Sequence, residues 1–343
     1  MSLVGGGLLL WLASTQLRLW PERLSIPRPQ LLWVALAVHI PYACIRAMRL
    51  SYLLDPVVAQ ASGRPDARMS RAVVYGSGFV SFLVLLVLPL KLGELSRPLL
   101  LVRGRQPGVR LTESLAAVGT ERIIDGLLIC AMLFGGLSLA GSFAPGITTN
   151  LGNAHAAGRL MLLVFGLALI ALLLIARRPE WAADLVRRRG GRLGPRGAEF
   201  LLRLTVPVAA LFDLRRSVPL VATSVLYWAV TTAQLWLAMS ACGVDVGAAE
   251  AAAIVAIIGL SIQLPGGPAQ AGTFQVGVAA ALGLFLTPEA LAGPGSSFAV
   301  VMYLLQFAGA ALMALPGALL VARMATSEVL APDPGSDDGV GPA

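Results

Sequence analysis

Charged side chains at the edge of a long apolar run are the residues of this sequence that could do chemistry. Glu121, Arg122 and Asp125 lie in GTERIIDGLL, directly before the uncharged run of residues 126–158. In a helix, Glu121 and Asp125 share one face, and Arg122 can pair with Asp125 three residues later. A charge at the centre of a membrane span costs about 2.5–3.5 kcal/mol on insertion scales. The cluster therefore predicts either a buried polar site or an ion cluster at the membrane interface.

Two further segments carry charged residues that could join this cluster. LPLKLGELSRPLLLV holds Glu94 and Arg97 beside a proline and a glycine that predict a turn. RAMRLSYLL holds Arg46 and Arg49 at the end of an apolar run. Guanidinium groups bind phosphate strongly, so Arg46 and Arg49 could contact a lipid headgroup. The alternative is that they anchor the helix end at the interface by snorkelling.

The segment SIQLPGGPAQAGTFQVG interrupts the longest uncharged run, residues 251–288, with two prolines and four glycines. Irregular backbone at membrane depth is tolerated only beside protein or a watery cavity, which predicts a polar half-site. A helix starting at Thr273 would direct free N–H groups at a phosphate, with Gly272, Thr273 and Gln275 as headgroup-binding residues. The alternative is that the small residues serve close helix packing.

The elements that must position these residues are membrane helices. Of the 343 residues, 57% are hydrophobic and 13% are charged, whereas soluble domains carry about 25% charged residues. A helix needs roughly 20 apolar residues to cross the hydrocarbon core. The uncharged runs are residues 1–17, 29–45, 72–90, 126–158, 160–176, 217–244, 251–288 and 290–322. They predict an all-α, polytopic membrane helix bundle with about six spans and two re-entrant hairpins.

The predicted hairpins comprise residues 72–102 and 251–287, each broken by a Leu-Pro step followed by glycine. Arginine-rich segments flank the first hairpin, which predicts that both of its ends lie inside. The second hairpin lies in a region without Lys or Arg, which predicts that its ends lie outside. Entry from opposite sides predicts a possible inverted repeat, which is an architecture of transporters.

Charges in the loops predict the orientation of the chain, whose net charge is +8. Residues 177–216 carry ten Arg against four acidic residues and are expected as a basic amphipathic segment on the cytoplasmic leaflet or as a cap on the bundle. Residues 242–297 carry no Lys or Arg and are expected outside. This topology places both termini in the cytoplasm and the chain in the inner cell membrane. Residues 17–28 carry three Arg but lie on the outer side in this topology, which opposes the rule that basic loops stay in the cytoplasm.

Several classes of function are not supported by any pattern in the sequence. It has no Walker loop, no HExxH and no GxSxG, so no catalytic residue is assigned and the chain is not expected to be an enzyme. Its three Cys and two His lack metal-ligand spacing, so no metal or cofactor is expected. The net positive charge is explained by basic cytoplasmic loops of a membrane protein, so nucleic acid is not expected as a partner. Residues 325–343 are rich in Asp, Pro and Gly and predict a disordered tail after a transmembrane domain of residues 1–324.

The charged and Gly-rich segments together resemble the lysylphosphatidylglycerol synthase transmembrane-region family of flippase-like membrane proteins. Its Gly-Glu-x-x-Arg pattern corresponds to residues 93–97, Glu-Arg-x-x-Asp to residues 121–125 and an early Arg-x-x-Arg to residues 46–49. The Gly-x-Phe-Glu pattern corresponds to residues 272–275, where Gln275 replaces the frequent Glu. The resemblance covers about residues 1–323. It does not include the soluble aminoacyl transferase domain that follows this region in synthase members. It therefore implies lipid translocation rather than aminoacylation.

The function expected from these features is movement of a polar or phosphate-bearing lipid headgroup between leaflets. Its partner would be a membrane phospholipid or another phosphate-bearing lipid, and the sequence leaves the oligomeric state open. One alternative is a secondary transporter of a small polar solute or ion that uses the same cavity. Another is a non-catalytic accessory subunit of a cell-envelope lipid or glycan enzyme.

Overall fold

The computed structural model describes residues 2–329 except residues 20, 22, 89–91, 142, 145–147, 190, 192–193 and 265–266. Within these residues every regular element is a helix, which confirms the all-α prediction. The α-helices are α1 (Ser2–Ser14), α2 (Gln30–Met48), α3 (Ser51–Ser62), α4 (Arg71–Val87), α5 (Ser96–Arg103), α6 (Leu111–Leu139), α7 (Thr148–Arg177), α8 (Pro179–Arg189), α9 (Gly194–Ala209), α10 (Leu214–Ala241), α11 (Ala248–Ser261), α12 (Thr273–Leu282), α13 (Pro288–Ala290) and α14 (Ser296–Val329).

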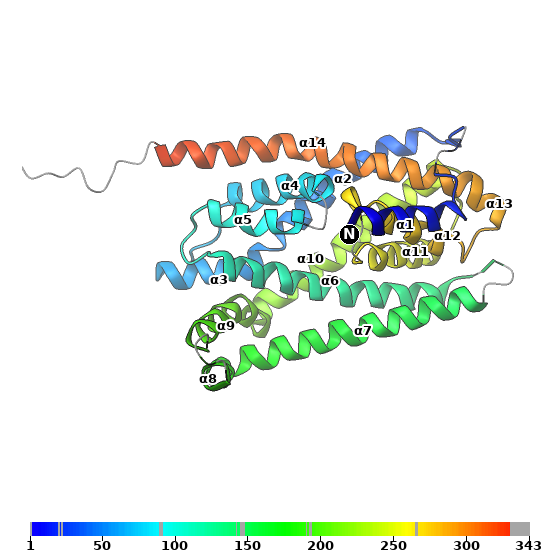
Figure 1. Cartoon of the computed structure of the whole chain (residues 1–343). Coiled ribbons are helices and arrows are strands. Elements are labelled where there is room, and N and C mark those ends of the chain that lie inside the picture. Colours follow the sequence, from blue (N-terminus) through cyan, green and yellow to red (C-terminus); the bar gives the residue numbers. More distant parts are fainter. Residues whose placement is uncertain are drawn as a thin grey trace, which may run out of the picture.

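Long apolar helices form the frame of the molecule and run along it from end to end (Figure 1). In the described part of the chain, five segments are long and apolar enough to cross a membrane. They are Gln30–Ser62, Leu111–Leu139, Asn150–Arg177, Leu214–Ala241 and Pro288–Arg323. Since about 20 residues suffice for a crossing, the prediction of a polytopic membrane bundle is confirmed.

Two pairs of shorter helices fill opposite halves of this frame (Figure 1). In one half, α4 has 17 residues and is followed by the 3₁₀ turn Leu92–Leu95 and the 8-residue α5. In the other half, α11 has 14 residues and α12 has 10. The two pairs enter from opposite ends and meet halfway along the bundle, as the hairpin prediction required. The sequence segments at both tips, 89–91 and 265–266, lie outside the described residues.

The first helix differs from the sequence prediction, which made residues 1–17 a full span. α1 has only 13 residues, and it lies beside α12 in one half of the bundle (Figure 1). A Cβ added at Gly6 would lie 2.8 Å from the Cα of Gly267, so glycine permits close contact with the second hairpin. The described chain therefore has five long spans instead of six, and α1 begins halfway along the bundle.

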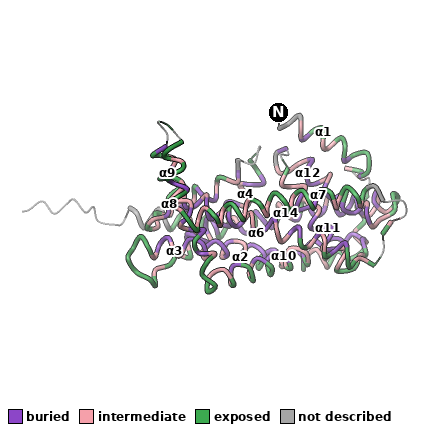
Figure 2. The backbone as a smooth tube through the Cα atoms, turned by 90° about the horizontal axis from the view of Figure 1, so that it is seen from below, coloured by how far each residue is buried: buried purple, intermediate pink, exposed green. Residues whose placement is uncertain are grey.

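The side chains buried by this packing gather along the interior of the bundle, while α7 and the ends are largely exposed (Figure 2). One core of apolar residues joins α2, α6, α10, α11, α12 and α14. A second, smaller core joins α3, α4, α6 and the start of α10. Between them lies the region where the two hairpins meet.

One end of the bundle carries α3, α8 and α9 (Figure 1). The predicted amphipathic segment of residues 177–216 forms α8, α9 and the start of α10 rather than one surface helix. α9 buries Ala198, Thr205 and Val208 and packs against α3, α6 and α7. Phe200 remains exposed, at 48% of its surface. The segment is thus a cap on the bundle that still presents apolar and basic side chains.

The C-terminal end corrects the predicted start of the tail. α14 continues to Val329, so the first residues of the segment expected to be disordered from Ala325 are helical. Residues 330–343 lie outside the described residues, and their disorder stays a prediction.

Candidate functional site

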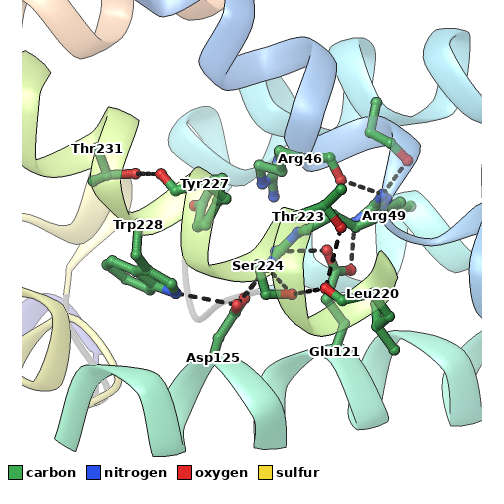
Figure 3. Close-up of polar contacts among 12 residues, drawn as sticks. Arg46, Arg49, Glu121, Asp125, Leu220, Thr223, Ser224, Tyr227, Trp228 and Thr231 are labelled. Carbon is green, nitrogen blue, oxygen red and sulfur yellow. Dashed lines mark hydrogen bonds and ion pairs between the residues drawn. The ribbon is translucent and has the colours of Figure 1, made fainter. Parts of the chain in front are cut away.

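A buried chain of alternating charges joins α2, α5 and α6 at the inner end of the first hairpin (Figure 3). Arg49, which is 1% exposed, lies at the bend between α2 and α3 and faces two carboxylates of α6. Its Nη2 donates to Oε1 of Glu121 at 2.7 Å, and its Nη1 donates to Oδ1 of Asp125 at 2.5 Å. Glu121 and Asp125 share a helix face as predicted. Arg49 is therefore neither a snorkelling anchor nor an exposed headgroup contact.

Arg97 of α5 extends the same chain from the first hairpin. Its Nη1 donates to Oε2 of Glu121 at 2.7 Å. Its Nη2 donates to the backbone carbonyls of Arg46 and Ala47 at 3.0 and 3.1 Å. These carbonyls belong to the last turn of α2, where the helix dipole favours a cation. Arg49 and Arg97 thus balance Glu121 and Asp125 in charge, and the four groups tie the hairpin to α2 and α6.

Polar and aromatic side chains of α10 complete the surroundings of Asp125 and Arg49. Trp228 donates its indole N–H to Oδ1 of Asp125 at 3.1 Å, and Ser224 accepts from Nη1 of Arg49 at 3.1 Å (Figure 3). The guanidinium carbon of Arg49 lies 4.2 Å from the ring centroid of Tyr227. Such cation–π contacts stabilise a desolvated guanidinium. Sequence reasoning missed all three α10 residues because each lies about 100 residues or more from its partner along the chain.

A cavity of about 100 Å³ lies beside this network, where the two hairpins meet. Arg46, Glu94 and Arg122 line it, together with Gln263 and Gln270 of the second hairpin. An adjoining cavity of about 20 Å³ shares Arg46, Glu94 and Arg122 and reaches Arg97 and Glu121. The hairpins therefore build one polar space from opposite ends of the bundle.

The charges facing this space differ from those of the network behind it. Within the described residues, Arg46, Glu94 and Arg122 take part in no side-chain ion pair within 4.0 Å. The guanidinium of Arg46 lies over the ring of Phe82 at 4.8 Å. The pairing of Arg122 with Asp125 expected from their spacing is therefore wrong, because Asp125 faces α2 and α10 and is taken by Arg49. Asp125 lines the cavity as well, so two guanidinium groups and one carboxylate face it in addition to the carboxylate paired with Arg49.

Uncharged polar side chains surround these charges. They come from three helices and the second hairpin, and none was singled out by sequence reasoning: His39, Tyr42, Thr231, Gln234, Gln263, Gln270 and Gln306. His39 is buried, with Nδ1 3.2 Å from the amide nitrogen of Gln234 and no partner at Nε2 among the described residues. Amide side chains within uncharged runs were the signal that could have revealed them, because a buried amide requires a partner.

The residues predicted as a headgroup half-site in the second hairpin, Gly272, Thr273 and Gln275, make local contacts within the hairpin. Gln275 accepts the backbone N–H of Gly272 through Oε1 at 2.8 Å, and Thr273 donates to the carbonyl of Gln270 at 3.0 Å. Gly272 has a φ of +87° and lies so close to α1 that an added Cβ would be 2.7 Å from the carbonyl oxygen of Gly6. All three residues hold the turn and the start of α12, while Gln263 and Gln270 face the cavity. Headgroup binding by Gly272, Thr273 and Gln275 remains a prediction without geometric support.

Gly93 also serves packing rather than binding. A Cβ added there would lie 2.3 Å from the Cα of Leu85, so only glycine lets the turn after α4 fold back on that helix. Glu94 follows directly and faces the cavity. For metals, no group of three or more His, Cys, Asp or Glu in the described ranges could hold an ion.

The arrangement suits the binding of an anion next to a rigid support. Arg46 and Arg122 can each offer several N–H donors to a phosphate, and their charges exceed that of Glu94. The adjacent network of Arg49, Glu121, Arg97 and Asp125 has no net charge. It therefore holds the helices together without competing for the bound anion. A buried network of this kind loses about 3–5 kcal/mol when one partner is removed.

Comparison with known proteins agrees with these motifs. Residues 1–314 match the family described as "Lysylphosphatidylglycerol synthase TM region". No curated protein and no solved structure matches the chain. With its apolar spans, the chain is an integral, multi-pass membrane protein, and it belongs to the lysylphosphatidylglycerol synthase transmembrane-region family.

Proposed function

We propose that the protein moves a phosphate-bearing lipid headgroup between the leaflets of the membrane through the cavity between its hairpins. The observation that carries this proposal is the charge of the cavity. Arg46 and Arg122 face it without an ion-pair partner within 4.0 Å among the described residues, while neighbouring Arg49 and Arg97 both form ion pairs with Glu121. A phosphate would supply the missing acceptor.

The architecture supports the same reading. Each hairpin reaches only halfway, and the two enter from opposite ends (Figure 1), which is the arrangement expected if the cavity opens to each side in turn. Sites between broken helices near the midplane are typical of proteins that alternate access. Small shifts of one hairpin against the fixed network could open one side at a time.

The proposal also names the setting and the partner. The lipid is a membrane phospholipid or another phosphate-bearing lipid, and no catalytic step is involved. The basic end with α8 and α9 faces the cytoplasm of a cell whose inner membrane holds the protein, because basic loops stay inside. The C-terminal end of α14 would then be cytoplasmic (Figure 1).

The test is lipid translocation in vesicles that contain the purified protein and a trace of phosphatidylglycerol with a fluorescent acyl chain. Dithionite added outside bleaches only the outer leaflet, so the remaining signal reports translocation. We expect Arg122→Gln and Arg46→Gln to slow it about tenfold each, since a lost charge-assisted hydrogen bond removes about 1.5–3 kcal/mol. Arg110→Gln is the matched control, because Arg110 is an exposed arginine of the same region outside the cavity.

Two outcomes would contradict the proposal. If vesicles with folded wild-type protein lose no more fluorescence than protein-free vesicles, the protein does not translocate the lipid, and the accessory-subunit hypothesis would be favoured. Unchanged translocation in Arg122→Gln and Arg46→Gln would mean that the cavity does not carry the headgroup.

The small size of the cavity favours one second candidate, a carrier for a small polar solute or anion. About 100 Å³ holds a group of a few heavy atoms. Inorganic phosphate distinguishes the two, because a solute carrier would accumulate it in vesicles whereas a lipid translocator would not.

A further inference from the structure

A groove opens sideways from the bundle next to the charged cavity. It has a volume of about 550 Å³ and lies between α6, α10 and α11. Small side chains line much of it, including Ala131, Ala229, Ala233 and Ala252. Ala131, Ala229 and Ala233 are exposed, so the groove faces the hydrocarbon around the spans.

The polar groups along this groove are all engaged elsewhere. Trp228 donates its N–H to Asp125, and Trp236 donates its N–H to the carbonyl of Val246 at 2.9 Å. The hydroxyl of Thr232 donates to the carbonyl of Trp228 at 2.9 Å. The groove therefore offers ring faces and methyl groups but no free donor, which suits a hydrocarbon chain and not a polar ligand.

The length and position of the groove fit one acyl chain. From Val225 to Trp236, α10 rises about 16 Å at 1.5 Å per residue, which is about half of the ~30 Å hydrocarbon core. Trp236 lies in the last turns of α10, bonded to Val246 just before α11 begins, and this end of α10 points away from α8 and α9 (Figure 1). Indole rings gather at the interface between headgroups and hydrocarbon, so Trp236 marks the outer end.

Trp228 lines both the groove and the charged cavity. Its ring is 9% exposed, and it stands edge-on to Tyr227 with centroids 5.3 Å apart. One side chain thus separates hydrocarbon from the charges at Arg46 and Arg122, and a hydrogen bond to Asp125 holds it there.

We propose that this groove holds one acyl chain of a phosphate-bearing lipid, and that Trp228 is the wall the headgroup passes to enter the charged cavity. The proposal rests on the lipid translocation proposed above. It adds where the tail lies during that movement, which side of the bundle opens, and which residue must move.

Photo-crosslinking tests the groove without any measurement of translocation. The probe is phosphatidylglycerol with a diazirine in one acyl chain, in phosphatidylcholine vesicles containing the full chain. We expect label on α10 between Val225 and Trp236, and about tenfold less in Ala229→Trp, equivalent to ~1.4 kcal/mol. Ala171→Trp, the same change at an exposed alanine of α7, is the matched control. Ala233→Leu repeats the test with a smaller obstruction should Ala229→Trp fail to fold.

Equal labelling of α10 in wild type, Ala229→Trp and Ala233→Leu would overturn the groove as an acyl site. Labelling that follows the proposal in vesicles that show no translocation would overturn the proposed function and support the groove. The two failures are thus distinguishable.

The wall is tested by cysteine accessibility. Thr231 lines the charged cavity, so Thr231→Cys in a Cys44→Ala background reports entry from the hydrocarbon by a lipid-soluble maleimide. We expect slow labelling with Trp228 in place and at least severalfold faster labelling with Trp228→Ala. Equal rates would overturn the assignment of Trp228 as the wall.

Discussion

Arg49 and Arg122 carry the same charge in neighbouring parts of the bundle, but their surroundings differ. Arg49 is buried between Glu121 and Asp125, with its guanidinium over the ring of Tyr227. Arg122 lines the cavity and takes part in no ion pair within 4.0 Å in the described part of the chain. The first arginine is therefore expected to matter for stability and the second for binding.

This difference predicts opposite results for two matched substitutions. Arg49→Gln leaves the buried carboxylate of Asp125 without its arginine and Glu121 with Arg97 alone, so it should lower the free energy of unfolding by about 3–5 kcal/mol. Arg122→Gln removes a cation that has no such partner and should melt close to wild type. Thermal unfolding in detergent measures both, and a loss of stability in Arg122→Gln as large as in Arg49→Gln would show that Arg122 is structural.

Sequence reasoning identified the charged residues but could not assign their partners. Glu94, Arg97 and Glu121 were expected near one another, and the structure brings them together around the smaller of the two adjoining cavities. Local spacing favoured Arg122 as the partner of Asp125, whereas the actual partner, Arg49, is 76 residues away. Helix periodicity fixes which side chains share a face, but tertiary packing decides what lies opposite that face.

At the scale of elements, the start of α12 shows how a broken helix is held without a charged cap. The side chain of Gln275 reaches back to the N–H of Gly272, which is one half of a capping box. The positive φ of Gly272 excludes most other residues there. The Gly-rich segment is thus explained by a tight turn packed on α1, and the residues facing the cavity precede it.

The cap predicts a ranking of variants at position 275. Gln275→Leu removes the acceptor and should destabilise the start of α12 by about 0.5–2 kcal/mol. Gln275→Glu keeps the acceptor and adds a negative charge at a helix N-terminus, so it should match or exceed wild type. Hydrogen exchange of the α12 amides measures the effect. Equal protection in Gln275→Leu and wild type would contradict the capping role.

The two hairpins were predictable because prolines and glycines interrupt apolar runs, whereas the fate of α1 was not. Residues 1–17 are uncharged, and hydropathy does not say how deep such a segment begins. Its position depends on Gly6 meeting Gly267, a contact between the first and the second half of the chain. A short, glycine-rich apolar segment can therefore pack against a re-entrant hairpin even where its hydropathy predicts a full membrane span.

At the scale of the whole molecule, the two ends differ in charge. The end with α3, α8 and α9 carries most of the arginines. At the other end, Arg28 forms a pair with Asp245 through contacts of 2.7 and 3.2 Å. This partner raises the pKa of Arg28 and offsets one of the three arginines that opposed the predicted topology. The charge difference between the ends thus still favours the α8–α9 end as cytoplasmic.

This orientation can be measured with one cysteine at each end. Glu289 is exposed in α13, and Asp66 is exposed in the loop between α3 and α4. In a Cys44→Ala background, whose two other cysteines are buried, a membrane-impermeant maleimide added to intact cells should label Glu289→Cys and leave Asp66→Cys unlabelled. Permeabilised cells, in which both should react, are the control. Labelling of Asp66→Cys alone in intact cells would reverse the orientation, and labelling of both would mean that the long helices do not separate the two ends by a membrane. Because each hairpin enters from one of these ends, the result also decides which hairpin enters from the cytoplasmic side. The acyl groove, which runs towards the Glu289 end, would then open to the outer leaflet.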